Sequence, residues 1–407
     1  QFFTSRAGLT IDNADVALFA LNYNNNNGSN YSYTIPTNDF TSSGNDWNNA
    51  AHWVNGSVPP SGANVIINSN MTMASGTATL IGLTINNTFT LTQNSGATIN
   101  LQASGDATSI VNNGTFVANG NVNFQSAGNN QTLTHTISGN AVTFGTTSIV
   151  TVSGAKTGEN VALSFGTNAY TINGTLQLNA GGTIAASKAP NYGTSSTLIY
   201  NQGGTIGRSV EWSTTSGAGY PNNITVKNNT TLNIATGDNS TARSIRGNLT
   251  IESGSSVSMQ ALTALLTING AIDVQGTASL TLSSASGGNL SVRGNVTFST
   301  TSTITDNSRT ITLDGNNSVT ITGGNKTISA LTINKGIASS TITFNTNSLT
   351  VSGSTTVTSG VIIPNGNLTI GSAGSLVLNS LSGTVETNSP TYVSGSTISY
   401  GGGSARN

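Results

Sequence analysis

Short apolar runs recur along residues 245–298, each with one polar residue between its apolar members, as in the run LTI at 249–251. This period of two is typical of a strand with one buried face. Gly247, Gly270 and Gly294 begin equivalent runs at intervals of about 23 residues, a spacing typical of solenoids. A β-α-β unit would need about 30 residues. The spacing therefore predicts a parallel β-helix whose turns stack on one another.

The composition of the chain agrees with a solenoid and argues against several other classes. Charged residues make up 6% of the 407 residues and the net charge is −1, so we expect no surface for nucleic acid. No apolar run approaches the roughly 18 residues of a transmembrane segment. Cysteine is absent, which excludes disulfides and thiolate metal sites. Because Lys and Glu are scarce and the chain starts at Gln1, as a cleaved mature end does, we expect an extracellular or cell-surface location.

The predicted fold is all-β, a right-handed parallel β-helix (solenoid) of roughly 14 coils with a short N-terminal extension. At about 4.8 Å per coil, the rod would be on the order of 70 Å long. The predicted divisions are an N-terminal extension that includes a candidate assembly strand (1–43), a cap rich in Trp and Pro (44–64), the β-helix (65–390) with an irregular protruding loop at about 188–221, and a C-terminal tail (391–407).

The alternation also predicts which side chains fill the core. Each apolar residue of a run points to the same face, and a fully buried one contributes about 1.5–3 kcal/mol before entropy is subtracted. The residues expected to be buried are Leu249, Ile251, Ile268, Ile272, Leu280, Leu290, Val296 and Leu313.

Three tryptophans stand in the irregular parts of the chain. Trp47 and Trp53 lie six residues apart before the first regular runs, and Trp212 lies in the predicted loop. Large aromatic side chains can cover the open edge of a stack of strands, so we interpret the first pair as a structural cap. The alternative is that these tryptophans form a platform on which surface glycans stack.

The opening GNDWNNAAHWVNGSVPPSGANVIIN at 44–68 resembles the start of large surface β-helix proteins of the Bacteroidota. The segment LTINKGIASSTITFNTNSLTVSGSTTVTSG at 331–360 is similar to the rungs of the same adhesin-like proteins. The resemblance implies secretion by the type IX route and display on, or release from, the cell surface. Such proteins usually end in a sorting domain, and none is recognisable before residues 404–407, so we expect that it was removed on secretion or that the sequence is a fragment.

Side chains able to carry chemistry are few. His52 and His135 are the only histidines, and both are interpreted as ordinary turn or strand residues without metal-ligand spacing. Enzymes that cut acidic polysaccharides need converging carboxylates. Glu252 and Asp273, 21 residues apart, are the pair that a solenoid could bring together. We expect no catalytic residues, no metal, no cofactor and no enzymatic activity.

Three functions remain, of which a non-catalytic structural or adhesive rod, such as a subunit of a surface filament, is favoured. The second is a carbohydrate-binding or carbohydrate-active protein that uses the tryptophans. The third is an ice-binding solenoid, since Thr303 and Thr305, and likewise Thr310 and Thr312, flank single apolar residues. Against the third, these pairs follow an irregular register in the sequence.

The predicted partner is a second copy of the chain, added head to tail. The N-terminal segment carries strand-like apolar runs that belong to no rung, and such a segment can add a strand to a neighbour's exposed edge. Because a head-to-tail contact does not close on itself, it propagates as a filament. The residues assigned to this assembly are Phe2, Phe3, Leu9, Ile11, Val16, Leu18 and Leu21.

Overall fold

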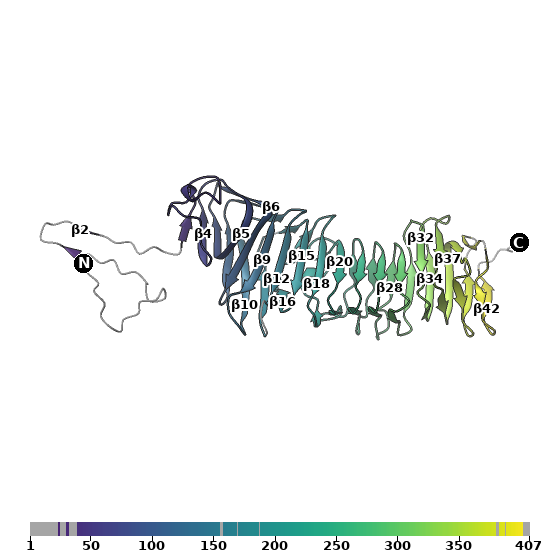
Figure 1. Cartoon of the computed structure of the whole chain (residues 1–407). Coiled ribbons are helices and arrows are strands. Elements are labelled where there is room, and N and C mark those ends of the chain that lie inside the picture. Colours follow the sequence, from purple (N-terminus) through teal and green to yellow (C-terminus); the bar gives the residue numbers. More distant parts are fainter. Residues whose placement is uncertain are drawn as a thin grey trace.

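Parallel pairing between strands one turn apart runs almost the whole length of the chain and produces an elongated β-solenoid of about 15 turns (Figure 1). The computed structural model describes residues 23–24, 30–31, 39–154, 158–168, 170–186, 188–379, 382–386 and 388–401. Among these residues there is no α-helix, and the helical elements are two 3-10 turns, η1 (Ala50–His52) and η2 (Val210–Trp212). The predicted all-β parallel solenoid is confirmed.

The first turns contain the longest strands of the molecule. The two-stranded antiparallel pair β1 (Tyr23–Asn24) and β2 (Asn30–Tyr31) precedes them. The solenoid strands up to the middle of the chain are β3 (Asp39–Thr41), β4 (Ala63–Ile67), β5 (Met71–Ile85), β6 (Thr90–Ala103), β7 (Ala107–Asn112), β8 (Thr115–Ala118), β9 (Asn121–Ser126), β10 (Thr132–Gly139), β11 (Thr143–Phe144), β12 (Ile149–Ser153), β13 (Asn160–Ser164), β14 (Thr171–Ile172), β15 (Thr175–Asn179), β16 (Gly182–Ile184), β17 (Asn191–Tyr192), β18 (Thr197–Asn201) and β19 (Thr205–Gly207).

From β20 onward each turn supplies short strands to three parallel sheets. The first comprises β20 (Asn223–Val226), β23 (Leu249–Ile251), β26 (Ile272–Val274), β29 (Val296–Phe298), β32 (Val319–Thr322), β35 (Thr341–Phe344), part of β37 (Ser354–Ile363) and β40 (Gly383–Val385). The second begins with β19 and continues with β21 (Thr231–Asn233), β24 (Ser256–Ser258), β27 (Ser279–Thr281) and β30 (Thr303–Thr305). In the later turns a separate four-stranded sheet follows it, formed by β33 (Lys326–Ile328), β36 (Leu349–Val351), β38 (Leu368–Ile370) and β41 (Thr391–Tyr392). The third comprises β22 (Arg243–Ile245), β25 (Leu266–Ile268), β28 (Leu290–Val292), β31 (Thr310–Leu313), β34 (Ala330–Asn334), the rest of β37, β39 (Ser375–Leu378) and β42 (Thr397–Tyr400).

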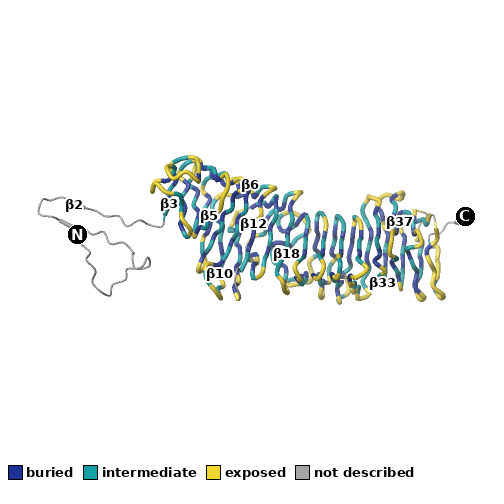
Figure 2. The backbone as a smooth tube through the Cα atoms, in the orientation of Figure 1, coloured by how far each residue is buried: buried dark blue, intermediate teal, exposed yellow. Residues whose placement is uncertain are grey.

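The register between successive turns places apolar side chains above apolar side chains along the axis of the solenoid. Leu249 pairs with Ile272, and Ile272 pairs with Val296, so one inward column is apolar from turn to turn. The buried residues follow the interior of the rod without a break (Figure 2). All eight residues predicted for the core are at most 3% exposed, which confirms that prediction.

The repeated glycines mark the places where one turn lies directly on the backbone of the next. A Cβ atom on Gly270 would lie 2.6 Å from the carbonyl carbon and oxygen of Gly247, and one on Gly294 would lie 2.5 Å from the carbonyl carbon of Gly270. The amide of each also donates a 2.9 Å hydrogen bond to the carbonyl below it. The regular spacing of Gly247, Gly270 and Gly294 in the sequence therefore corresponds to a column of stacked positions at which a side chain would clash with the backbone of the preceding turn.

We expect Gly270→Ala to lower the free energy of unfolding by about 1–3 kcal/mol, because rigid backbone atoms oppose the new methyl group. Gly204→Ala is the control, since a Cβ there meets nothing within 4 Å. Chemical denaturation of both variants and the parent makes the comparison. Equal stability of the two variants would contradict this account of the glycine column.

Three predicted boundaries are wrong. The predicted C-terminal tail at 391–407 contains β41 and β42, which pair in parallel with β38 and β39, so the solenoid continues to Tyr400 and does not end at 390. The strand β3 lies inside the predicted N-terminal extension, yet it pairs in parallel with β4, so the solenoid begins by Asp39 and not at 65. The predicted loop at 188–221 is also too wide, because β17, β18 and β19 within it are regular rungs that pair with β14, β15 and β21. Only residues 208–222 leave the strand pattern, since their sequence lacks the alternation.

Candidate functional site

Trp47 and Trp53 pack against each other in the interior of the first turn. Their ring centroids are 5.0 Å apart with the planes at 83°, an edge-to-face contact, and each residue is 2% exposed. The indole Nε1–H of Trp53 donates to the carbonyl oxygen of Trp47 at 2.8 Å, and the amide of Trp47 donates to Thr72 in the next turn. Their interpretation as a cap stays a prediction.

Trp212 is fully buried, and it lies within the stack rather than on a protruding loop. Its Nε1–H donates to the carbonyl oxygen of Ser244 in β22 at 2.9 Å, while the hydroxyl of Tyr192 in β17 donates to the carbonyl oxygen of Glu211 at 3.0 Å. The turn η2 is therefore hydrogen-bonded to both β17 and β22. Only residues 215–217 of this segment are exposed.

The glycan-stacking assignment for Trp47, Trp53 and Trp212 is wrong. A sugar ring needs an exposed aromatic face, and none of these residues is more than 2% exposed. The sequence could not separate the two interpretations because an aromatic residue in a turn serves equally well in the core or on the surface. The seven assembly residues between Phe2 and Leu21 lie outside the described residues, so their role stays a prediction.

The two histidines are held by neighbouring groups, as expected of ordinary turn and strand residues. His52 Nδ1 accepts a hydrogen bond from the amide of Asp46 at 3.1 Å. His135 is fully buried, with Nδ1 2.6 Å from the hydroxyl of Ser109 and Nε2 2.8 Å from the carbonyl oxygen of Gln125. Since a carbonyl only accepts, Nε2 carries the proton and Nδ1 accepts from Ser109. Burial lowers the pKa of His135.

Because His135 is buried in its neutral form, we expect it to lower the free energy of unfolding in acid. Because its folded pKa lies below the unfolded value of 6.5, its contribution to stability is present above pH 6.5 and is lost as pH falls through the folded pKa. We expect His135→Gln to show a flatter acid limb than the parent, by up to about 1.4 kcal/mol per pH unit. Urea unfolding between about pH 8 and pH 5 measures this. Parallel pH profiles of the two proteins would refute it.

The register does not bring the two candidate carboxylates into direct opposition. Asp273 pairs with Thr250 on one side and Thr297 on the other, so Glu252 is offset by two residues from it. Instead, Asp273 accepts a 2.7 Å hydrogen bond from the side chain of Gln275. Within the described ranges no group of three or more His, Cys, Asp or Glu could hold a metal ion, and no helix is long and apolar enough to cross a membrane.

A buried polar cluster next to η2 was missed by the sequence analysis. The Oε1 atom of Glu211 accepts hydrogen bonds from the hydroxyl of Tyr200 and the amide of Ser209, both at 2.8 Å, while its Oε2 atom has no partner. Burial raises the pKa of Glu211. Burial and then the Glu211 carboxyl raise the pKa values of Tyr192 and Tyr200 well above 10.0.

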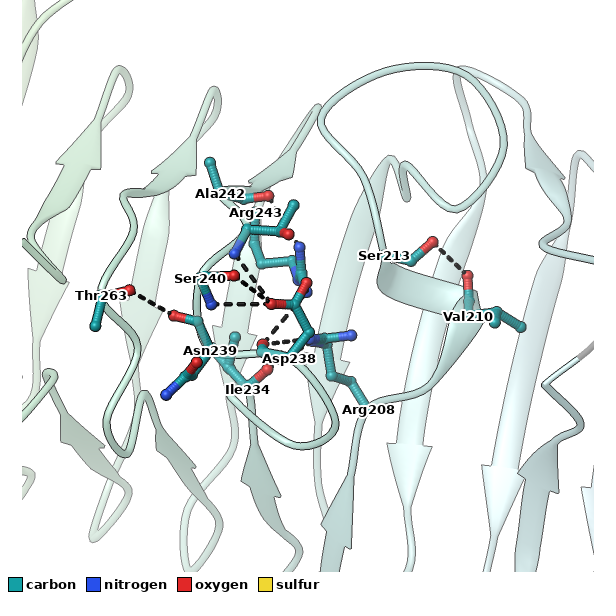
Figure 3. A network of polar contacts seen from close by, with 11 residues as sticks. Arg208, Val210, Ser213, Ile234, Asp238, Asn239, Ser240, Ala242, Arg243 and Thr263 are labelled. Atoms are coloured by element: carbon teal, nitrogen blue, oxygen red, sulfur yellow. Dashed lines mark hydrogen bonds and ion pairs between the residues drawn. The ribbon is translucent and has the colours of Figure 1, made fainter.

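An adjacent cluster joins three turns at one corner of the solenoid (Figure 3). The Asp238 carboxylate accepts hydrogen bonds from Ser240 and Thr241 through Oδ1, and it forms a 2.9 Å ion pair with Arg243 through Oδ2. Hydrogen bonding from Thr241, and then from Arg243 and Ser240, holds the pKa of Asp238 well below its usual range. Arg208 donates to the carbonyl oxygens of Ile234 and Asp238 at 2.6 and 2.8 Å.

The side of Asp238 that faces solvent borders a concavity of about 380 Å³ between two successive turns. It follows the ends of β21 and β24 and is lined by Ala235, Gly237, Asp238, Asn239, Gln260 and Ala261. The only sequence signal for it was the polar run TGDNST at 236–241, which interrupts the strands.

The second sheet also carries two outward columns of small polar side chains. In one column Thr231, Ser256, Ser279 and Thr303 follow one another in register, and in the other Asn233, Ser258, Thr281 and Thr305 do so. The hydroxyls of Thr231 and Ser256 are 2.9 Å apart. Thr310 and Thr312 lie in β31 of the third sheet, so the two Thr-x-Thr segments singled out in the sequence do not form one array.

No protein-family model, no curated protein and no solved structure matches this chain.

Proposed function

We propose that this chain is a non-catalytic, extracellular rod that serves a structural or adhesive role at a cell surface, as a filament subunit or an adhesin. The observation that carries the proposal is the apolar core that follows the described residues from Phe40 to Leu378, which makes the solenoid a stiff spacer. The resemblance of residues 44–68 to the Bacteroidota surface proteins supports display outside the cell, and secretion by the type IX route belongs to the same proposal.

Self-association is part of the proposed role. Ile398 and Tyr400 in β42 continue the inward columns of Leu376 and Leu378, yet they are 47% and 62% exposed. An apolar face of this kind is one onto which another strand can be added, with backbone hydrogen bonds providing affinity. The N-terminal runs between Phe2 and Leu21 are the proposed strand, donated by a second copy.

Electron microscopy of the purified chain tests this proposal. We expect rods about 70 Å long, joined end to end at high concentration. Deletion of residues 1–23 should leave single rods. Filaments that persist after the deletion, or an intact chain that stays monomeric at high concentration, would contradict the donated strand. Polysaccharide cleavage abolished by Glu252→Gln or Asp273→Asn would contradict the non-catalytic role.

The register of the second sheet favours a second candidate, an ice-binding solenoid. The strands that carry these outward Ser and Thr side chains lie about 4.8 Å apart, and the two columns are separated by about 6.7 Å along each strand. Such a two-dimensional array of hydroxyls can hold water in a regular lattice, which the scattered hydroxyls of an ordinary surface cannot do. Inhibition of ice recrystallisation by the parent, and its loss in Thr305→Lys, is the expected result. No inhibition by the parent at high concentration would eliminate this candidate.

A further inference from the structure

The concavity between residues 235–239 and 260–261 combines polar and apolar groups on a rigid frame. It has a volume of about 380 Å³ and is wide open to solvent, so it would contact one face of a ligand and would not enclose it. The methyl groups of Ala235 and Ala261 supply apolar contact, while Asp238, Asn239 and Gln260 supply polar side chains. The frame is rigid because both turns belong to the stacked solenoid and are joined by hydrogen bonds from Thr263 to the carbonyl oxygen of Asn239.

The Asp238 carboxylate is positioned to accept further hydrogen bonds. Ionised carboxylates offer about four acceptor sites over their two oxygens. Three donors from Ser240 and Thr241 occupy Oδ1, whereas Oδ2 accepts a single hydrogen bond, from Arg243. The Asp238 side chain is 35% exposed, and Oδ2, with one partner, retains acceptor capacity.

Two amide side chains complete the set. Asn239 and Gln260 are exposed, and no hydrogen bond joins either side chain to another described residue. In Figure 3 the main-chain oxygen of Asn239 bonds to Thr263, while its amide group carries no dashed line. Gln260 has a φ of 48°, a left-handed conformation that favours Gly or Asn over Gln. Each amide offers both donors and an acceptor.

The charges around the concavity argue against an ionic ligand. The carboxylate of Asp238 is paired with the buried guanidinium of Arg243, and Arg208 lies against the main chain of the same residue, so a divalent cation would meet two positive charges. Both guanidinium groups are at most 7% exposed and donate to protein acceptors, so they are not presented to an anion. What the site presents is a paired carboxylate, two amides and two methyl groups.

We propose that this concavity binds a neutral saccharide, with Asp238 accepting hydrogen bonds from sugar hydroxyls and Asn239 and Gln260 bonding neighbouring hydroxyls. The site is independent of the proposed structural role, because it is built on the side of the rod and not at its ends. It also differs from the tryptophan platform, since it contains no aromatic residue.

Saturation-transfer NMR on the full chain tests the proposal, with a panel of neutral mono- and disaccharides of glucose, galactose, mannose and N-acetylglucosamine. We expect at least one of these sugars to bind. Gln260→Gly and Asn239→Ala should each weaken that binding about tenfold, the equivalent of one hydrogen bond. Gln260→Gly should be at least as stable as the parent, because Gly adopts positive φ without strain.

Asn347→Gly is the matched control, since Asn347 is exposed, has a φ of 63° and lies far from the concavity in the sequence. It should bind sugar as the parent does. Calcium chloride alone and potassium galacturonate are the ionic arms of the test. No binding across the neutral panel, unchanged binding by both Gln260→Gly and Asn239→Ala, or tighter binding of either ionic probe than of every neutral sugar would overturn the proposal.

Discussion

Leu280→Asp is expected to unfold several turns of the solenoid and to lower the free energy of unfolding by at least about 4 kcal/mol. Leu280 is fully buried, and it pairs with Val257 in one turn and Ile304 in the next. A carboxylate at this place would have no partner in the apolar column, and burial of an isolated charge is among the most costly changes in a protein. Because each turn is supported mainly by its neighbours, the damage should spread along the axis.

Thr281→Asp is the control for this prediction. Thr281 is the next residue in β27, but it lies on the outward side of the strand, in the column with Ser258 and Thr305. We expect this variant to melt within a few degrees of the parent. Thermal unfolding followed by circular dichroism compares the two, and hydrogen exchange locates the turns that open. Similar melting of both variants would show that Leu280 does not lie in the core.

The second large effect concerns the pH dependence of stability at Glu211. Its folded pKa is raised above the ordinary value of 4.5 by burial, so its contribution to stability is fully present below pH 4.5 and is lost as pH rises through the folded pKa. Arg208 is the positive charge that opposes this shift, and Tyr200 and Ser209 donate to the carboxyl group. We therefore expect the contribution of Glu211 to the stability of the parent to fall as pH rises toward neutral, with a slope of up to about 1.4 kcal/mol per pH unit.

Glu211→Gln should remove this loss. The amide oxygen can still accept from Tyr200 and Ser209, but the side chain no longer ionises. Relative to the parent, the variant should gain stability as pH rises and match or fall below it in acid, where the carboxyl group is protonated. Urea unfolding across the range measures the difference between the two proteins. A difference that stays constant with pH would refute the assignment, whatever its size.

The titrations at Glu211 and His135 act in opposite directions. Acidification favours the folded state through Glu211 and disfavours it through His135, because burial raises the pKa of a carboxyl and lowers that of an imidazole. A pH profile of the parent alone would therefore show only the sum. Each single variant removes one contribution, so the two profiles together assign the slopes to residues.

The sequence by itself determined the fold and the core. Successive residues of a strand point to opposite faces, so the alternation in a run such as Leu249-Thr250-Ile251 is enough to predict which side chains point inward. The glycine spacing states the length of a turn, because the column at Gly247, Gly270 and Gly294 admits no Cβ atom. Neither inference needs knowledge of a contact between distant residues.

Only the tertiary structure decided what the surface presents and where the tryptophans lie. The register between turns places Thr303 beside Ser279, separates it from Thr310, and sets Asp273 opposite Thr250 instead of Glu252. A register shift of two residues would set Glu252 opposite Asp273, and the lengths of the irregular turns fix the register. For Trp212 and for Asp238 with Arg243, the deciding contacts come from a neighbouring turn or across a loop, where the sequence carries no alternation to reveal which side faces the core.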